Sequence, residues 1–342
     1  MRILVTGGAG FIGSNFCHYL SRRRPEWSIT VLDKLTYAGR RENLAGLEDS
    51  GRLRFIHGDI CVPEDVAEAM EGCSLVVNFA AETHVDRSIE DSAGFVRTDV
   101  DGVRVLLEEF RRREGRLFLQ ISTDEVYGSV ETGRSSEDDP LRPRSPYSAS
   151  KAGGELLAMG YWHTHRTPVV VTRASNNYGP RQYPEKLVPL FLTNAMEGES
   201  LPLYGDGANR RDWIYVEDHC AALLRVLEEA EPGSVYNIGA GEELSNLEVT
   251  RAILDAVGAG EELIRFVEDR PGHDRRYALD VSRIESELGW APSVDFEEGL
   301  RRTVRWYGDN EDWWKAIKSG RFREYYKRQY SRRLEESGGS PR

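Results

Sequence analysis

The sequence is poor in cysteine and in long apolar runs. Its 342 residues include four cysteines, none in a Cys-x-x-Cys pair, which argues against a metal site and favours a reduced cytoplasmic compartment. No stretch approaches the ~20 apolar residues that a membrane-spanning helix needs. The N-terminal run Ile3-Leu4-Val5 passes at once into glycines and is too short for a signal peptide. We therefore expect a soluble cytoplasmic protein that does not contact a membrane.

Positive charge is also in deficit. The chain has 45 lysines and arginines against 57 aspartates and glutamates, a net charge of -12. A nucleic-acid surface needs a basic stripe, so we expect no nucleic-acid partner. A few local arginines can still bind a phosphate-bearing ligand, because the local field can override the global one. The length suffices for one large or two modest domains.

Short apolar runs alternate with amphipathic segments in the first half of the chain. Continuous apolar runs are typical of strands buried on both faces, and amphipathic stretches between them predict helices. Together they predict an α/β fold with a Rossmann-type, doubly wound parallel sheet. The predicted strands are Ile3–Val5, Ile29–Leu32, Leu53–Ile56, Leu75–Phe79, Leu117–Ile121, Val169–Arg173 and Ser234–Ile238, and the predicted helices are Gly13–Arg22, Pro63–Glu71 and Asp99–Arg113.

The organisation changes after Asn177. Loops that contain glycine and proline become frequent, with the isolated helical segments Leu187–Glu197 and Asn246–Val257 between them. We predict a Rossmann domain over residues 1–177, completed by later strands, and a smaller, loop-rich substrate lobe over residues 178–334. Residues 321–333 have a helical composition, and residues 335–342 are predicted to form a disordered tail.

A glycine-rich loop joins the first predicted strand to the first helix. It has the pattern Gly7-x-x-Gly10-x-x-Gly13, in which the glycines allow a tight turn, close approach of a pyrophosphate and packing of the helix on the sheet. The helix N-terminus offers free N–H groups to the phosphates. Asp33 ends the second strand, where it can accept the hydroxyls of the adenosine ribose. Because a carboxylate repels a 2′-phosphate, NAD is favoured over NADP.

Other cofactor contacts are expected from the ends of the neighbouring strands. Asp59 and Ile60 follow the third strand, and Ala80 and Ala81 follow the fourth. A glycine turn with a surface aspartate is the alternative interpretation of the motif. The complete predicted cofactor set is Gly7, Gly10, Phe11, Ile12, Gly13, Asp33, Lys34, Thr36, Asp59, Ile60, Ala80, Ala81, Tyr147, Lys151 and Asn176.

Tyr147 and Lys151 are four residues apart on a predicted helix and therefore share one face. The lysine ammonium, with a positive nicotinamide nearby, is expected to lower the pKa of the tyrosine from ~10 towards neutrality. Tyr147 can then accept a hydroxyl proton while hydride leaves the same carbon. A helix tyrosine beside a solvated lysine is the alternative.

Thr123, Asp124 and Glu125 follow the fifth predicted strand, at the edge where ligands bind in open α/β sheets. When a sugar C4 is a ketone, the proton on C5 becomes acidic and a carboxylate can remove it. We predict Glu125 as this base and Asp124, with a raised pKa, as the acid that protonates the departing C6 hydroxyl. Thr123 is predicted to bond the C4 oxygen. Two loop carboxylates that cap the next segment are the alternative.

These motifs resemble the extended short-chain dehydrogenase/reductase family, and within it the dTDP-glucose 4,6-dehydratases. The glycine and Tyr/Lys motifs mark the superfamily, whereas the Thr-Asp-Glu run and the later segments are more specific. The resemblance covers nearly the whole chain and rests on Asp33–Gly39, Asn78–Ser88, Ser122–Gly128, Asn176–Leu187, Pro202–Gly207, Asn209–Trp213 and Asp269–Tyr277.

The resemblance implies conversion of dTDP-glucose to dTDP-4-keto-6-deoxyglucose, with NAD tightly bound and regenerated in each turnover. It also implies a homodimer formed through two helices per subunit, here within Asp99–Arg113 and Ser150–Tyr161. The substrate contacts that it implies are His84, Thr123, Asn176, Lys186, Leu187, Pro202, Tyr204, Arg211, Asn246, Arg270 and His273. The cations among them suit a diphosphate.

Four other functions use a similar scaffold. A nucleotide-sugar 4-epimerase needs the cofactor and the Tyr/Lys pair but has no use for an acid and a base at positions 124 and 125. A GDP-mannose dehydratase is expected to carry a single carboxylate there. A UDP-sugar 4,6-dehydratase stays open, since UDP and dTDP differ by one methyl and one hydroxyl. A non-catalytic NAD-binding module would not need the reacting set.

Overall fold

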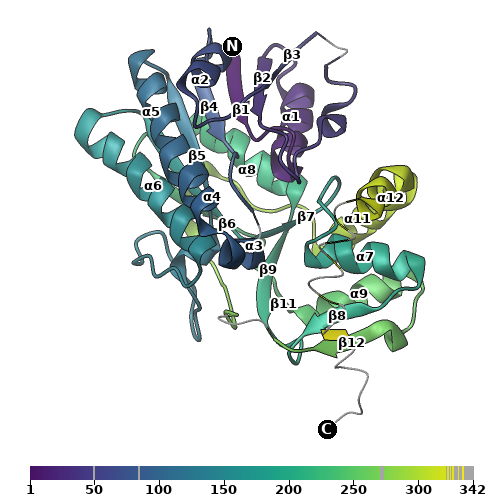
Figure 1. Cartoon of the computed structure of the whole chain (residues 1–342). Coiled ribbons are helices and arrows are strands. Elements are labelled where there is room, and N and C mark those ends of the chain that lie inside the picture. The colour runs from purple at the N-terminus through teal and green to yellow at the C-terminus, as the bar shows by residue number, and fades with distance from the viewer. Residues whose placement is uncertain are drawn as a thin grey trace.

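A seven-stranded parallel sheet forms the larger part of the molecule (Figure 1). The computed structural model describes residues 1–48, 51–83, 85–269 and 273–320, with residues 322, 324, 326, 330, 333 and 334. The strand order is β10-β6-β5-β4-β1-β2-β3. The strands are β1 (Arg2–Thr6), β2 (Ser28–Asp33), β3 (Leu53–His57), β4 (Leu75–Asn78), β5 (Leu117–Thr123), β6 (Val169–Ala174) and β10 (Val235–Ile238).

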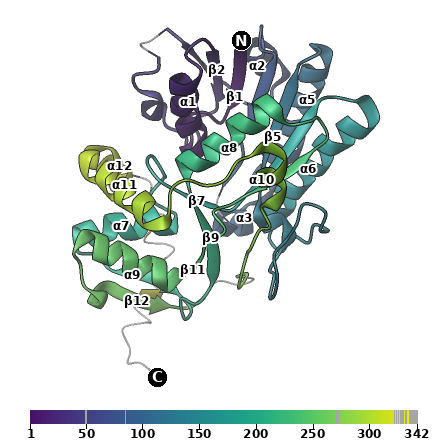
Figure 2. The same ribbon diagram turned by 180° about the vertical axis from the view of Figure 1, so that it is seen from behind.

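Helices cover both faces of this sheet, which explains why its strands are continuous apolar runs. One apolar core packs α1 (Phe11–Arg23), α8 (Val216–Glu229) and α10 (Ser282–Leu288) against one face. A second core packs α2 (Pro63–Ala69), α5 (Val103–Arg112) and α6 (Pro146–His165) against the other face. The two faces can be followed in Figures 1 and 2. The Rossmann-type fold predicted from the sequence is confirmed.

A smaller lobe has its own apolar core, which contains Leu190, Trp213, Ile253 and Trp314. Figure 1 shows it beside the carboxyl edge of the large sheet. Two small sheets belong to this part, with the strand orders β11-β9-β7 and β12-β8. The elements are β7 (Asn176–Tyr178), α7 (Leu187–Glu197), β8 (Leu201–Tyr204), β9 (Arg210–Tyr215), β11 (Glu243–Ser245), α9 (Asn246–Val257), β12 (Ile264–Val267), α11 (Phe296–Asp309) and α12 (Glu311–Ser319).

Short elements connect the main ones. They are the 3-10 helices η1 (Arg41–Leu44), η3 (Asp124–Tyr127) and η4 (Glu261–Leu263), the short helices α3 (Val85–Glu90) and α4 (Ser92–Val96), and the π-helical turn η2 (Arg97–Gly102). Among the described residues, no helix is both long and apolar enough to cross a membrane. The division of the chain at residue 177 stays a prediction.

The predicted helix Asp99–Arg113 is wrong at its start. The α-helix begins at Val103, and a π-helical turn precedes it. The π-helical turn packs closely against α6, where a Cβ on Gly154 would lie 2.3 Å from the carbonyl oxygen of Asp99. The fourth strand ends at Asn78, one residue before the prediction. Residues 335–342 and much of the predicted helix 321–333 lie outside the described residues.

Candidate active site

A cavity of about 320 Å³ lies at the carboxyl edge of the large sheet, where strands β1, β2, β4, β5 and β6 end. Every residue of the predicted cofactor set lines it, and so do all five residues predicted to react. In open α/β sheets, ligands bind at this edge. The structure therefore brings together residues that are far apart in the sequence, but it does not by itself assign their roles.

The glycine loop is shaped for a ligand that approaches the backbone. Gly7 has a φ of +66°, and a Cβ at this position would lie 2.6 Å from the backbone nitrogen of Ala80. A Cβ on Gly13 would lie 2.4 Å from the carbonyl oxygen of Gly7. Gly10 is the N-cap of α1 and offers no side-chain acceptor, so the N–H groups of the first helical turn stay available to a phosphate.

Asp33 stabilises the glycine loop as well as facing the cavity. Its Oδ2 accepts a hydrogen bond from the N–H of Ala9 at 2.9 Å, and its Oδ1 accepts one from the N–H of Leu35 at 2.8 Å. Burial raises the pKa of this carboxyl, and the two backbone bonds oppose the shift. Lys34 pairs with Asp59 at 2.8 Å beside it. The loop, the helix terminus and this carboxylate together fit a dinucleotide.

Thr123, Asp124 and Glu125 form the turn between β5 and η3. The Thr123 hydroxyl donates to Oδ1 of Asp124 at 3.0 Å and accepts from the N–H of Glu125 at 3.3 Å. Asp124 is buried, and its Oδ2 has no hydrogen-bond partner among the described residues. Burial, and then the charge of Glu125, raise the pKa of Asp124 to about 8. The Asp124 carboxyl therefore carries a proton at pH 7.

Helix α6 carries Tyr147 and Lys151 on one face, as predicted. A capping box between Ser145 and Ser148, with Pro146 in the first turn, fixes where the helix begins. The Lys151 side chain is buried, and its Nζ donates to the carbonyl oxygen of Ile121 at 2.8 Å. This bond attaches the start of α6 to β5, two residues before Thr123.

The predicted fall in the pKa of Tyr147 assumes a positive nicotinamide nearby and stays a prediction. Burial of the phenol raises this pKa well above its usual range, and the charges of Glu125, Asp99 and Asp124 act in the same direction. Burial also lowers the pKa of Lys151, while nearby Asp99 and Glu155 oppose this shift. The sequence pattern showed the lysine beside the tyrosine but not the three carboxylates around the phenol.

Asp99 is a buried residue that the sequence interpretation missed. Its Oδ2 accepts a hydrogen bond from the Ser150 hydroxyl at 2.6 Å, and its Oδ1 has no hydrogen-bond partner among the described residues. Burial raises its pKa to about 6, although the charge of Lys151 opposes the shift. In the sequence Asp99 appears only as one polar residue of an amphipathic segment, so no local signal separated it from its neighbours.

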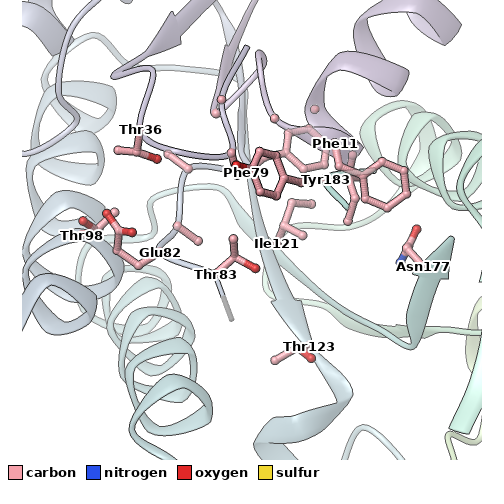
Figure 3. A pocket seen from close by; sticks show the side chains of 18 of the residues that line it. Phe11, Thr36, Phe79, Glu82, Thr83, Thr98, Ile121, Thr123, Asn177 and Tyr183 are labelled. Atoms are coloured by element: carbon pink, nitrogen blue, oxygen red, sulfur yellow. The ribbon is translucent and has the colours of Figure 1, made fainter. Parts of the chain in front are cut away.

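Several further residues line the cavity without having been predicted. In Figure 3, Thr36, Glu82 and Thr98 lie on one side of the pocket, Asn177 lies on the other, and Thr123 lies at the end of its strand. The lining residues that the sequence interpretation missed include Tyr37, Glu82, Thr83, Thr98, Ser122, Ser175, Asn177, Gln182, Tyr183, Glu185 and His219. Tyr37 and Glu185 lie within the sequence segments that carry the family resemblance.

Glu185 connects the smaller lobe to the cofactor side of the cavity. Its side chain is buried and accepts a hydrogen bond from the Tyr37 hydroxyl at 2.6 Å. Arg87 pairs with the same carboxylate at 3.1 Å and lies over the Tyr37 ring at 3.7 Å. These three residues come from segments far apart in the sequence, so their association could not be found by local patterns.

The predicted substrate contacts fall into two groups. Thr123, Asn176 and Lys186 line the cavity, whereas the remaining described ones lie in the smaller lobe outside its lining: Leu187, Pro202, Tyr204, Arg211, Asn246 and His273. His84 and Arg270 lie outside the described residues. The roles assigned to this set stay predictions.

Two of the smaller-lobe residues have side chains that contact other residues of the protein. Arg211 is buried, and its Nη2 donates to the carbonyl oxygen of Asp274 at 2.7 Å. The ring of His273 packs edge-on against Tyr204 with centroids 6.2 Å apart, and its Nδ1 lies 2.6 Å from Oδ1 of Asp269. A ligand that uses either residue therefore meets a side chain that is already oriented.

Comparison with known proteins agrees with this geometry. The family model described as GDP-mannose 4,6 dehydratase matches residues 4–303. A dTDP-glucose 4,6-dehydratase from Streptomyces niveus is 53% identical over 323 residues, which are 93% of this chain and 96% of the relative. The low-salt glycan biosynthesis protein Agl12 of Haloferax volcanii is 55% identical over 312 residues, which are 91% of this chain and 100% of the relative.

A solved structure is similar over nearly the same length. It is DesIV, a dTDP-glucose 4,6-dehydratase from Streptomyces venezuelae crystallised with NAD bound. The two share 50% sequence identity and superpose with a TM-score of 0.90, over 93% of this chain and 100% of the other. On the family match, the curated relatives and the shared fold, this chain belongs to the GDP-mannose 4,6 dehydratase family, in its group of dTDP-glucose 4,6-dehydratases.

Proposed function

We propose that this protein is an NAD-dependent dTDP-glucose 4,6-dehydratase that forms dTDP-4-keto-6-deoxyglucose. The observation that carries the proposal is the pair at the end of β5, where a carboxyl with a pKa of about 8 stands beside a second carboxyl. The cavity that contains this pair also contains Tyr147 and Lys151. Oxidation and reduction alone need no such acid, whereas loss of water needs both an acid and a base.

The first step is removal of the C4 hydroxyl proton by Tyr147, with Thr123 as hydrogen-bond donor to the same oxygen. When bound, NAD supplies the acceptor and later the donor of hydride, together with a positive charge that opposes the carboxylates around the phenol. Lys151 adds a second positive charge on the same helix face. These charges favour the phenolate that proton removal requires.

The second step is elimination of water across C5 and C6. Glu125 takes the C5 proton, which the C4 ketone has made acidic, and the electron pair of that bond forms the C5–C6 double bond. Asp124 gives its proton to the C6 hydroxyl, which leaves as water. With the hydride that bound NAD would return to C6, Glu125 would return a proton to C5, and the product would be a 4-keto-6-deoxy sugar.

Substrate recognition is assigned to the smaller lobe and the cavity rim. We propose that Asn176 and Lys186 contact the sugar diphosphate, because both line the cavity on the side of the smaller lobe. Pro202 and Tyr204 on β8 would flank the base, with Leu187, Arg211, Asn246 and His273 around the nucleoside and diphosphate. Arginine suits a diphosphate, because its planar fork can donate two parallel hydrogen bonds.

We also propose that the enzyme acts in the cytoplasm. All four cysteines are free thiols, and Cys17, Cys73 and Cys220 are buried. Free thiols persist in a reducing compartment. Recovery of the protein from the culture medium rather than from the cell extract would contradict this assignment.

The proposed activity is tested first with dTDP-glucose and purified protein, without added NAD. We expect a 4-keto-6-deoxy sugar, detected by its absorbance in alkali, with much less product from UDP-glucose. Equal product from UDP-glucose would favour a UDP-sugar 4,6-dehydratase. Interconversion of gluco and galacto forms without a keto sugar would identify a 4-epimerase.

Substitution of the elimination base and of the oxidation base should slow different steps of the reaction. Glu125→Gln removes the base and is expected to lower product formation by roughly 10²–10⁴-fold. It should still permit C4 oxidation, seen as absorbance of the reduced cofactor. Tyr147→Phe should slow the oxidation itself by a similar factor. Full C5 hydrogen exchange with solvent in Glu125→Gln would remove Glu125 from the role of base.

The raised pKa of Asp124 predicts a fall in activity at alkaline pH. A carboxyl with a raised pKa is protonated below that value, so the acid form is present below pH 8 and is lost above it. We expect kcat to fall about tenfold per pH unit above this point, since elimination needs the proton. The pH profile of Asp124→Asn, measured beside it, should lack this alkaline limb. An unchanged limb in the variant would assign it to another group.

We propose a homodimer formed through the helices that include α5 and α6. Leu156 on α6 is 60% exposed and Val96 at the end of α4 is 55% exposed, which is unusual for large apolar side chains. Light scattering should therefore give twice the chain mass of 38.7 kDa. Leu156→Arg should shift the protein towards the monomer. A monomeric mass for the unaltered protein would contradict the proposal.

A further inference from the structure

A buried ion pair joins β6 to helix α6 directly behind the reacting residues. Nη2 and Nε of Arg173 donate to Oε1 of Glu155 at 2.7 Å and 3.1 Å. The side chains of Arg173 and Glu155 are 7% and 2% exposed, so neither charge is solvated. Glu155 lies four residues after Lys151 and therefore on the same face of α6.

The remaining nitrogen of the Arg173 guanidinium, Nη1, contacts the turn Asp124–Tyr127, which we call the acid–base turn. Nη1 donates to the Tyr127 hydroxyl at 2.6 Å and to the carbonyl oxygen of Glu137 at 3.1 Å. The Tyr127 hydroxyl in turn donates to Oδ1 of Asn237 on β10 at 2.8 Å. Tyr127 is the last residue of η3, the short helix that begins with Asp124 and Glu125. One planar group thus joins the helix of Tyr147 and Lys151 to the turn of Asp124 and Glu125.

Both α6 and the turn have other contacts besides this connection. Helix α6 is also held by its capping box and by the bond from Lys151 to Ile121. The turn ends at Gly128, whose φ of +76° suits glycine, and the N–H of Arg142 donates to the carbonyl oxygen of Val126 at 2.9 Å. The Tyr127 side chain adds hydrogen bonds that connect this turn to β6 and β10, beside the apolar cluster that Val126 and Tyr127 form with Ala152 of α6.

Net stabilisation alone is a poor explanation for such a network. A buried ion pair often contributes little to the free energy of folding, because the desolvation of both charges offsets their attraction. A planar guanidinium with five donors does fix the relative positions of its acceptors. The network therefore suits a role in fixing the positions of the groups that it joins.

We propose that Glu155, Arg173 and Tyr127 are positioning residues for the elimination step. They hold the Asp124–Glu125 turn against α6, so that the base faces C5 and the acid faces the C6 hydroxyl while Tyr147 serves C4. The proposal rests on the proposed function for its chemical consequence. It implies that loosening the network slows elimination more than C4 oxidation.

The test is Tyr127→Phe, which keeps the ring over the guanidinium and removes the bridging hydroxyl. In the holoenzyme, we expect C5 hydrogen exchange and keto-sugar formation to fall at least tenfold. First-turnover C4 oxidation, followed by absorbance of the reduced cofactor, should stay within twofold. Backbone hydrogen exchange at Gly128 and Arg142 should become at least tenfold faster, and this measurement needs no substrate.

The matched control is Tyr236→Phe. Tyr236 is a buried tyrosine on β10 next to Asn237, and its hydroxyl donates to Oε2 of Glu287 at 2.8 Å, away from the cavity. This control loses a similar bond and should leave both the balance between the two steps and the exchange at Gly128 unchanged. Arg173→Lys is the second variant if Tyr127→Phe does not fold. It keeps a charge opposite Glu155 but lacks the fork, and it should show the same imbalance.

The results that would contradict the positioning role differ from those that would contradict the proposed function. Equal slowing of oxidation and elimination, or unchanged exchange at Gly128 and Arg142, would overturn the positioning role. Absence of keto sugar from the unaltered enzyme would contradict the proposed function instead. In that case the hydrogen-exchange comparison still decides whether the network holds the turn.

Discussion

Parallel strands all end at the same edge of a sheet, and the site of this protein depends on that constraint. Thr6, Asp33, Asn78, Thr123 and Ala174 end their strands at this edge, and their neighbours line one cavity. Because helices bury both faces, the strands are continuous apolar runs whose register is fixed by packing. The polar residues that follow each strand are thereby brought together at one edge. The glycine loop, the acid–base turn and the face of α6 are three outcomes of this one constraint.

Within the cavity, burial assigns different protonation states to chemically similar groups. Asp124 is buried beside Glu125, and its pKa is raised to about 8, which suits the acid and base roles proposed for the two carboxyls. Asp99, buried beside Ser150, opposes the effect of burial on Lys151. The same carboxylates raise the pKa of Tyr147, so the base role proposed for it would require the positive charge of a bound cofactor. The reacting groups are therefore electrostatically dependent on one another and on the ligand.

The sequence was sufficient wherever function follows from local pattern. The pattern of apolar residues predicted the sheet, and the glycine spacing predicted the loop at Gly7–Gly13. The position after the fifth strand placed Asp124 at the edge of the sheet. The shared helix face of Tyr147 and Lys151 was predicted from their spacing on an expected helix. The pattern failed at Asp99, which lies in a π-helical turn packed against Gly154, because an amphipathic period does not separate a π-helical turn from an α-helix. It also did not show that burial and the charges of Asp99, Asp124 and Glu125, from two other segments, raise the pKa of Tyr147.

The residues that were missed share a physical reason. Arg173 lies 18 residues from Glu155 and 46 from Tyr127, so their contacts exist only after β6 has paired with β5 and α6 has packed on the sheet. Tyr37 and Glu185 are 148 residues apart and meet only where the two lobes adjoin. Groups that contact a ligand recur in short motifs because the chemistry demands particular side chains. Groups that position them can come from any segment that the fold brings near, so they become visible only in three dimensions.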